Sequence, residues 1–180
     1  MEKIFVVSDI WFNRPYDQYS DMSSDEYNKM IIESWNSVVS EEDVVFVLGG
    51  LGISELYPYF IKLNGEIHIL NNAYTTDEIS FLGFLQNNVN GSSNELIKRK
   101  FNFEHEQIVA LIDEDVMLSY YPLADWGGKD TGTMQIHGFN EIHNFKENSF
   151  TCMLSANEFK PLLISELKET IEKIKKNLSK

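Results

Sequence analysis

Three short apolar runs in the first half of the chain are each followed by polar residues or glycines. The runs are residues 4–7, 44–48 and 67–70. Their length and their content of β-branched and large apolar residues predict buried strands. The residues that follow them are Ser8-Asp9, Gly49-Gly50 and Asn71-Asn72. Because ligand sites in open α/β sheets commonly lie at the carboxyl ends of strands, this pattern predicts a site there.

Helical periodicity fills the intervals between these runs. Ser23 and Glu26 have the spacing of a capping box, and the apolar residues after them recur at helical intervals, which predicts a first helix. A second helix is predicted from about residue 54 to residue 63, and Thr76 is placed to cap a third. Residues 86–93 are rich in Asn, Gly and Ser, which predicts a loop.

The second half of the chain has closely spaced strands in place of this alternation. The predicted strands are residues 107–113, 115–121, 134–139 and 150–154. The chain is expected to end in an amphipathic helix from about residue 162 to residue 178, with a basic outer face near its end. These elements predict one α/β domain over residues 1–180.

Composition and charge limit the classes of function. A chain of 180 residues, 43% of them hydrophobic, is large enough for one domain with a sizeable core. Its net charge of −13 argues against generic binding to nucleic acid or to anionic membranes, because these partners are also negative. The only cysteine is Cys152, so no disulfide can form within the chain. No run is long enough for a signal-peptide core or a membrane span, and we expect a cytoplasmic protein.

Five segments at the expected strand ends resemble the metal-binding loops of calcineurin-like metallophosphoesterases, in the family's order. They are most similar to the small bacterial and phage branch of that family. The segments are residues 8–14 (like D-x-H), 48–51 (like G-D), 71–74 (like G-N-H-D/E), 119–123 (like S-H-Y-P-L) and 137–141 (like H-G-H-x-H). The resemblance covers residues 4–167 and implies a β-sandwich of two facing sheets flanked by helices, with a two-metal site at the strand ends.

Most positions that would bind metal in this family carry other residues here. The position of the aspartate that bridges the two metals is Gly50, which has no side-chain oxygen. Trp11 replaces a histidine, and its indole nitrogen can only donate a hydrogen bond. Ala73 replaces the histidine that would assist protonation. Asp9 and Asn72 match the family's ligands.

The two remaining loops show the same trend. Tyr120 and Phe139 stand where the resemblance places histidines, and Glu141 stands where it places a third. Asp9, Asn72 and Glu141 are therefore the only candidate metal ligands, and in the family they would be divided between two ions. His137 precedes the ligand positions and His143 follows them, and we assign neither a metal role. We expect no catalytic residues and no bound metal.

The replacements convert the expected metal pocket into an aromatic one, lined by Trp11, Tyr74, Tyr120 and Phe139. The favoured interpretation is that the rings fill the space the metals left, since a well-buried ring stabilises a fold by about 2 kcal/mol. The alternative is a cavity in which a flat ligand stacks while Arg14 and Asn72 bind its anionic group.

Three hypotheses follow from this pattern. The first is a pseudoenzyme that binds a protein partner or a small ligand without turnover. The second is a divergent phosphoesterase that uses Asp9, Asn72 and Glu141 to hold one divalent ion, Mn, Fe or Zn. The third is a nucleotide-binding module built on the aromatic pocket. The first is preferred because both the bridging position and most histidine positions have changed.

Overall fold

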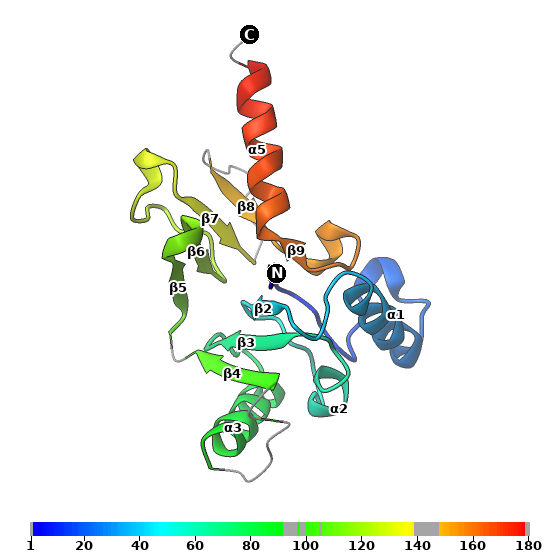
Figure 1. Cartoon of the computed structure of the whole chain (residues 1–180). Helices are drawn as coiled ribbons and strands as arrows, with labels where there is room; N and C mark the ends of the chain where they lie inside the picture. The colour runs from blue at the N-terminus through cyan, green and yellow to red at the C-terminus, as the bar shows by residue number, and fades with distance from the viewer. Residues whose placement is uncertain (1, 92–96, 98–99, 105, 139–147, 179–180) are drawn as a thin grey trace.

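A computed structural model describes residues 2–91, 97, 100–104, 106–138 and 148–178. The chain forms one mixed α/β domain in which two mixed sheets are flanked by helices (Figure 1). None of the helices in the described ranges is long and apolar enough to cross a membrane.

The first sheet has the strand order β4-β3-β2-β1-β9. Its central strands are parallel, and β9 pairs antiparallel with β1 through Phe5 and Val6. The strands are β1 Ile4–Val7, β2 Val44–Val47, β3 Glu66–Leu70, β4 Phe101–Glu104 and β9 Leu162–Leu163. The carboxyl ends of β1, β2 and β3 therefore lie at one edge of this sheet.

The second sheet has the order β5-β6-β7-β8. Its strands are β5 Ile108–Leu111, β6 Val116–Ser119, β7 Met134–His137 and β8 Ser149–Thr151. β5 is antiparallel to β6, whereas β6, β7 and β8 are parallel. An isolated parallel bridge between Ser8 and Met153 links the exit of β1 to the segment after β8.

The helices lie around the first sheet and beyond its β9 edge (Figure 1). They are α1 Ser24–Asn36, α2 Tyr57–Phe60, α3 Thr76–Gly91 and α5 Ile164–Leu178. Short 3-10 segments also occur in the described part of the chain: η1 Asp17–Tyr19, η2 Ile112–Glu114, η3 Lys129–Thr131 and η4 Leu154–Asn157. The predicted capping box of Ser23 and Glu26 is present at the start of α1, where each residue accepts from the other's backbone N–H.

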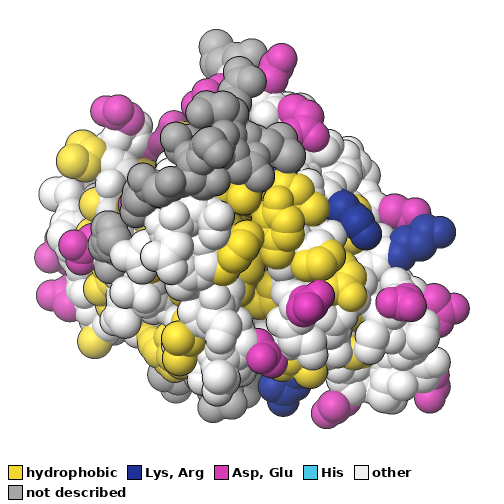
Figure 2. Space-filling view, turned by 90° about the horizontal axis from the view of Figure 1, so that it is seen from below, with side chains coloured by type: hydrophobic (Ala, Val, Ile, Leu, Met, Phe, Trp, Pro, Cys, Tyr) yellow, Lys and Arg dark blue, Asp and Glu magenta, His cyan; other side chains and the backbone are white. Residues whose placement is uncertain are grey.

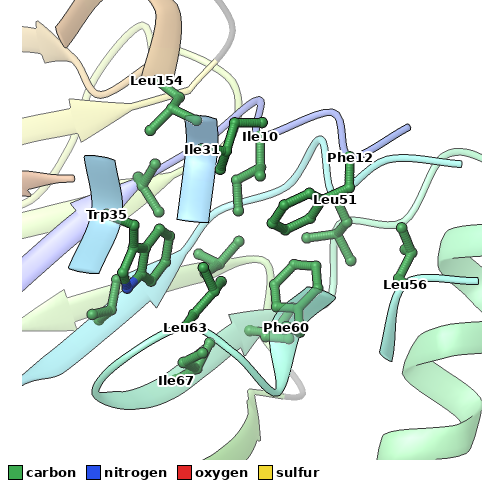
Figure 3. Close-up of a cluster of buried hydrophobic side chains, with 14 of the residues drawn as sticks. Ile10, Phe12, Ile31, Trp35, Leu51, Leu56, Phe60, Leu63, Ile67 and Leu154 are labelled. Carbon is green, nitrogen blue, oxygen red and sulfur yellow. The ribbon is translucent and has the colours of Figure 1, made fainter. Parts of the chain in front are cut away.

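Two clusters of buried apolar residues hold these elements together. The first packs α1, α2 and α3 against one face of the first sheet, with Trp35 and Phe60 among its fully buried side chains (Figure 3). The second combines residues of both sheets, such as Val6 and Leu48 with Leu118 and Ile136. The two sheets therefore share a core.

Several predicted boundaries were wrong. The helix expected over residues 54–63 contains only Tyr57–Phe60. Ser54 adopts a positive φ of 63°, and Pro58 fits only in the first turn of a helix, so the helix begins no earlier than Tyr57. Residues 86–93 were expected to form a loop, but the residues as far as Gly91 are the last part of α3. The last helix begins at Ile164, because Leu162–Leu163 pair with β1 as β9.

Candidate functional site

The loops after β1 and β2 run side by side. The backbone N–H of Asp9 donates to the Gly49 carbonyl at 2.9 Å, and the N–H of Trp11 donates to the Gly50 carbonyl at 3.0 Å. A parallel bridge between Phe12 and Gly52 continues this pairing. The pairing brings the residues of the first two predicted loops into direct contact.

Asp9 is the buried centre of the site. Its side chain accepts hydrogen bonds from the Tyr120 hydroxyl at Oδ1 and from the Ser8 hydroxyl at Oδ2, both at 2.8 Å. The Trp11 indole donates to the same carboxylate, and the Tyr16 hydroxyl donates to the Asp9 backbone carbonyl. Burial raises the pKa of Asp9 above its ordinary value, and the three side-chain donors oppose this shift. Hydrogen-bond donors therefore surround the carboxylate.

Gly50 lies directly against Asp9. It has a φ of 68°, a left-handed conformation that favours glycine. A Cβ atom placed on it would lie 2.7 Å from both the Cα and the Oδ1 of Asp9. Neither distance is a normal van der Waals contact, and one of the two atoms belongs to the backbone. With this backbone, position 50 has no room for a carboxylate side chain.

Tyr120 fills the space beside Asp9. Its side chain is buried, and a Cβ on Gly49 or on Gly138 would lie 2.8 Å from its ring. The two glycines thus allow the ring to lie close to the backbone of both strand ends. Burial, followed by the nearby Asp9 charge, raises the pKa of Tyr120, so its hydroxyl remains a donor. A tyrosine thus bonds to Asp9 from a position where the sequence resemblance predicted a histidine.

Two further tyrosines cover Tyr120. The rings of Tyr74 and Tyr121 each lie 5.1 Å from the Tyr120 ring, centroid to centroid, and 5.8 Å from each other. Tyr74 is 47% exposed and Tyr121 is 50% exposed. We call these three residues the tyrosine cluster. It has one buried ring and two rings that face solvent.

Trp11 and Arg14 form a second aromatic feature. The Arg14 guanidinium lies 5.0 Å from the centroid of the Trp11 ring, in a cation–π arrangement. The Arg14 backbone N–H donates to the Trp11 carbonyl at 2.9 Å, which closes the turn between the two residues. Arg14 is exposed, so its charge remains accessible at the end of this loop.

The side chain of Asn72 links three backbone segments at the strand ends. Its buried amide nitrogen donates to the Leu48 carbonyl at 2.9 Å and to the Gln107 carbonyl at 3.4 Å. The side chain therefore ties the exit of β3 to the exit of β2 and to the segment before β5. These contacts use both protons of the amide group.

Glu78 is an important residue of the site that the sequence reasoning missed. It is fully buried, and its Oε1 accepts from the Leu51 N–H at 2.7 Å. Its Oε2 accepts from the N–H groups of Tyr74 and Thr75, at 2.8 and 2.9 Å. Thr75 accepts in turn from the Glu78 N–H at 3.1 Å, so the cap of α3 is Thr75 and not Thr76 as predicted. The signal was the spacing Thr75-x-x-Glu78, which is that of a capping box.

Two predicted site residues, Phe139 and Glu141, lie outside the described residues, as does His143. His137 is fully buried on β7. Within the described ranges, no group of three or more His, Cys, Asp or Glu side chains is arranged to hold a metal ion. The structure thus brings together Asp9, Trp11, Arg14 and the tyrosine cluster, with Asn72 and Glu78 fixing the loops around them.

Comparison with known proteins identifies similar chains of unknown role. The uncharacterized protein MJ1445 of Methanocaldococcus jannaschii is 37% identical over 81 residues, a match that covers 37% of this chain and 43% of that protein. A protein of unknown function from Aquifex aeolicus, AQ665, has a similar crystal structure, with a TM-score of 0.58 and 16% identity. That alignment covers 94% of this chain and all of the other, and it establishes a common fold alone. No protein-family model matches the chain.

Proposed function

We propose that the chain is a degenerate metallophosphoesterase-like β-sandwich that acts by binding and has lost hydrolysis. Three features support this relationship. The chain has two mixed sheets that share a core, and the loop segments with family-like motifs follow their strands. The first two of these loops are paired through their backbones at Asp9 and Gly49. The third is tied to them through Asn72 and Glu78.

The single observation that carries the loss of hydrolysis is the environment of Asp9. A carboxylate that binds a metal needs free lone pairs directed at the ion. Here one oxygen accepts from Tyr120 and the other from Ser8, each at 2.8 Å, and the Trp11 indole adds a third donor. These donors compensate the buried negative charge, a role that the metal ions have in active members of the family.

The exposed part of the same loops is the proposed binding surface. It consists of Tyr74, Tyr121, Trp11 and Arg14. Tyrosine, tryptophan and arginine are the residue types that most often dominate the energy of protein interfaces. Tyr120 fills the interior below them, so a partner is expected to bind on these side chains and not in a deep pocket. We therefore favour a protein partner over a small ligand.

Hydrolysis and metal binding test the proposal together. The purified protein should contain no bound metal that is lost in Asp9→Asn. It should not cleave bis(p-nitrophenyl) phosphate when Mn²⁺, Fe²⁺ or Zn²⁺ is added. Asp9→Asn is the matched control, because it removes the charge and keeps the size of the side chain. Turnover in the wild type that disappears in Asp9→Asn would favour the single-metal phosphoesterase and overturn the proposal.

The two half-exposed tyrosine rings also suit a nucleobase, which can stack on an aromatic face. Thermal unfolding with a panel of nucleotides distinguishes this second candidate. We expect no change in Tm with any nucleotide. An increase in Tm that is lost in both Trp11→Ala and Tyr74→Ala would favour a nucleotide site.

A further inference from the structure

A hollow lies between α2 and α3. Its volume of about 540 Å³ is within the range of pockets that bind small molecules. Figure 2 views the molecule from the side of these helices and shows apolar side chains gathered there with acidic side chains beside them. The described residues that line the hollow are Ser54, Glu55, Tyr57, Pro58, Asp77, Ser80, Phe81 and Phe84.

Aromatic rings form the apolar wall of the hollow. The ring of Tyr57 on α2 lies 5.2 Å from the ring of Phe84 on α3, centroid to centroid, in an edge-to-face arrangement. Phe81 is buried one turn earlier on α3, whereas Phe84 is 39% exposed. An apolar ring that lines the hollow therefore remains in contact with water. A ligand that covers this ring would be stabilised by burial of apolar surface.

A hydrogen bond joins the two walls of the hollow. The backbone N–H of Ser54, just before α2, donates at 2.8 Å to Oδ2 of Asp77 in the first turn of α3. The contact between Tyr57 and Phe84 joins the same two helices farther along. These two contacts fix the helices relative to each other. A ligand would meet a preformed shape, which lowers the entropic cost of binding.

The charge of the hollow is negative. Its two charged side chains among the described residues are Glu55 and Asp77. Asp77 is engaged by Ser54, whereas Glu55 is exposed and has no ion-pair partner in the described part of the chain. The net charge of the whole chain, −13, adds to the attraction for cations. Because aromatic faces also attract cations, both features favour an organic cation with an apolar body.

We propose that the hollow binds a small organic amine. Its apolar part packs on Tyr57 and Phe84, and its ammonium group lies beside Glu55. Size disfavours a protein partner, because eight of the described residues line the hollow, whereas a stable protein interface has about 20–30 residues on each side. The hollow shares no residue with the tyrosine cluster and does not include Asp9. This inference therefore does not depend on the proposed function of the strand-end site.

Three probes with one carbon skeleton test the charge preference. Phenylbutylamine, phenylbutanol and phenylbutyrate are positive, neutral and negative at neutral pH. Backbone amide chemical shifts of the full chain, recorded during titration, report both the affinity and the position of each probe. The amine should bind about fivefold or more tightly than the alcohol and should shift the amides of residues that line the hollow. The butyrate should bind most weakly, and added salt should weaken the amine alone.

Two variants separate the apolar contact from the charged one. Phe84→Ala should weaken the amine and the alcohol alike, by about tenfold, because both lose the exposed ring. Glu55→Gln should weaken the amine by about threefold and leave the alcohol unchanged. Ile79→Ala and Glu42→Gln are the matched controls, since both residues are exposed and neither lines the hollow. Both controls should bind the amine as the wild type does, and circular dichroism checks that all four variants fold.

Several results would overturn the proposal. One is an amine that does not bind at millimolar concentration, and another is equal affinity for the three probes. An amine affinity that is unchanged in Glu55→Gln would also contradict it. A capped dipeptide of phenylalanine and lysine that binds more tightly than phenylbutylamine would replace the small amine with a protein segment. Amide shifts in the hollow that change with protein concentration alone would replace it with a second copy of the chain.

Discussion

Asp9 is a carboxylic acid in a place that disfavours its charge. It is 3% exposed, and burial raises its pKa above the ordinary value of 3.8. The folded state therefore binds this proton more tightly than the unfolded chain does. The resulting stabilisation is complete below the unfolded pKa and is lost as the pH rises through the folded pKa.

Replacing Asp9 with Asn removes this pH dependence. The free energy of unfolding of Asp9→Asn, relative to the wild type, should therefore increase as the pH rises from about 4 to about 7. Urea unfolding of both proteins at several pH values measures the difference. A difference that falls over this range would mean that the Tyr120, Ser8 and Trp11 donors outweigh burial and hold the folded pKa below its unfolded value.

Gly50 makes a second prediction at the residue scale. Gly50→Ala should destabilise the fold by about 2 kcal/mol or more, because alanine is strained at a positive φ and its Cβ would meet Asp9. Gly83→Ala is the matched control. Gly83 lies inside α3, and a Cβ there meets nothing within 4 Å, so alanine should stabilise the helix by about 0.5–1 kcal/mol. Midpoints of urea unfolding measure both. Equal effects would show that Gly50 is not constrained by Asp9.

At the scale of elements, one side chain joins the loops after β2 and β3. Glu78 accepts from Leu51 on one loop and from Tyr74 and Thr75 on the other. Glu78→Gln should destabilise the protein by about 2–3 kcal/mol, because an amide loses the charge and directs a donor at a backbone N–H. Glu26→Gln is the control, since Glu26 has the same capping-box position on α1 but is exposed. Its effect should be much smaller. Similar losses of thermal stability in the two variants would contradict the joining role.

Periodicity predicted the existence of most elements and the polar exits of the first three strands. It missed β4 and β9. The run Phe101–Glu104 is half polar, and Leu162–Leu163 has only two residues, so neither has the apolar length that indicates a buried strand. The order of the strands within each sheet could not be predicted from the residue pattern either, because it depends on contacts between distant segments. The pairing of β9 with β1 joins Val6 to Leu162, 156 residues away, and has no local signal beyond two leucines.

The positions of the site residues could be predicted from the sequence, but the hydrogen bonds between them could not. The loops named Asp9, Trp11, Asn72, Tyr74 and Tyr120, and all five lie at the strand ends or contact them. The hydrogen bond from Tyr120 to Asp9 joins residues 111 positions apart, and only the fold brings them together. Glu78 was missed because its spacing indicates a helix cap, whereas its contact with Leu51 depends on the tertiary structure.

At the scale of the whole molecule, the core between the sheets decides how the chain unfolds. Val6 and Leu48 of the first sheet pack in one cluster with Leu118 and Ile136 of the second. Loss of either sheet would expose the apolar surface of the other. Both sheets should therefore unfold in a single cooperative transition.

Two of the three tryptophans can report on this transition separately. Trp35 lies in the cluster between the helices and the first sheet, and Trp126 is buried beside the second sheet, where its indole donates to the Thr133 carbonyl at 2.9 Å. Variants that keep only one of them, with phenylalanine at the other tryptophan positions, should give fluorescence transitions with the same urea midpoint as circular dichroism of the same variant. Ile136→Ala in each variant should lower both midpoints together, since removing part of a buried side chain from the shared core costs about 2–5 kcal/mol. A lower midpoint for Trp126 alone would mean that the second sheet unfolds independently and that the shared core does not couple the two.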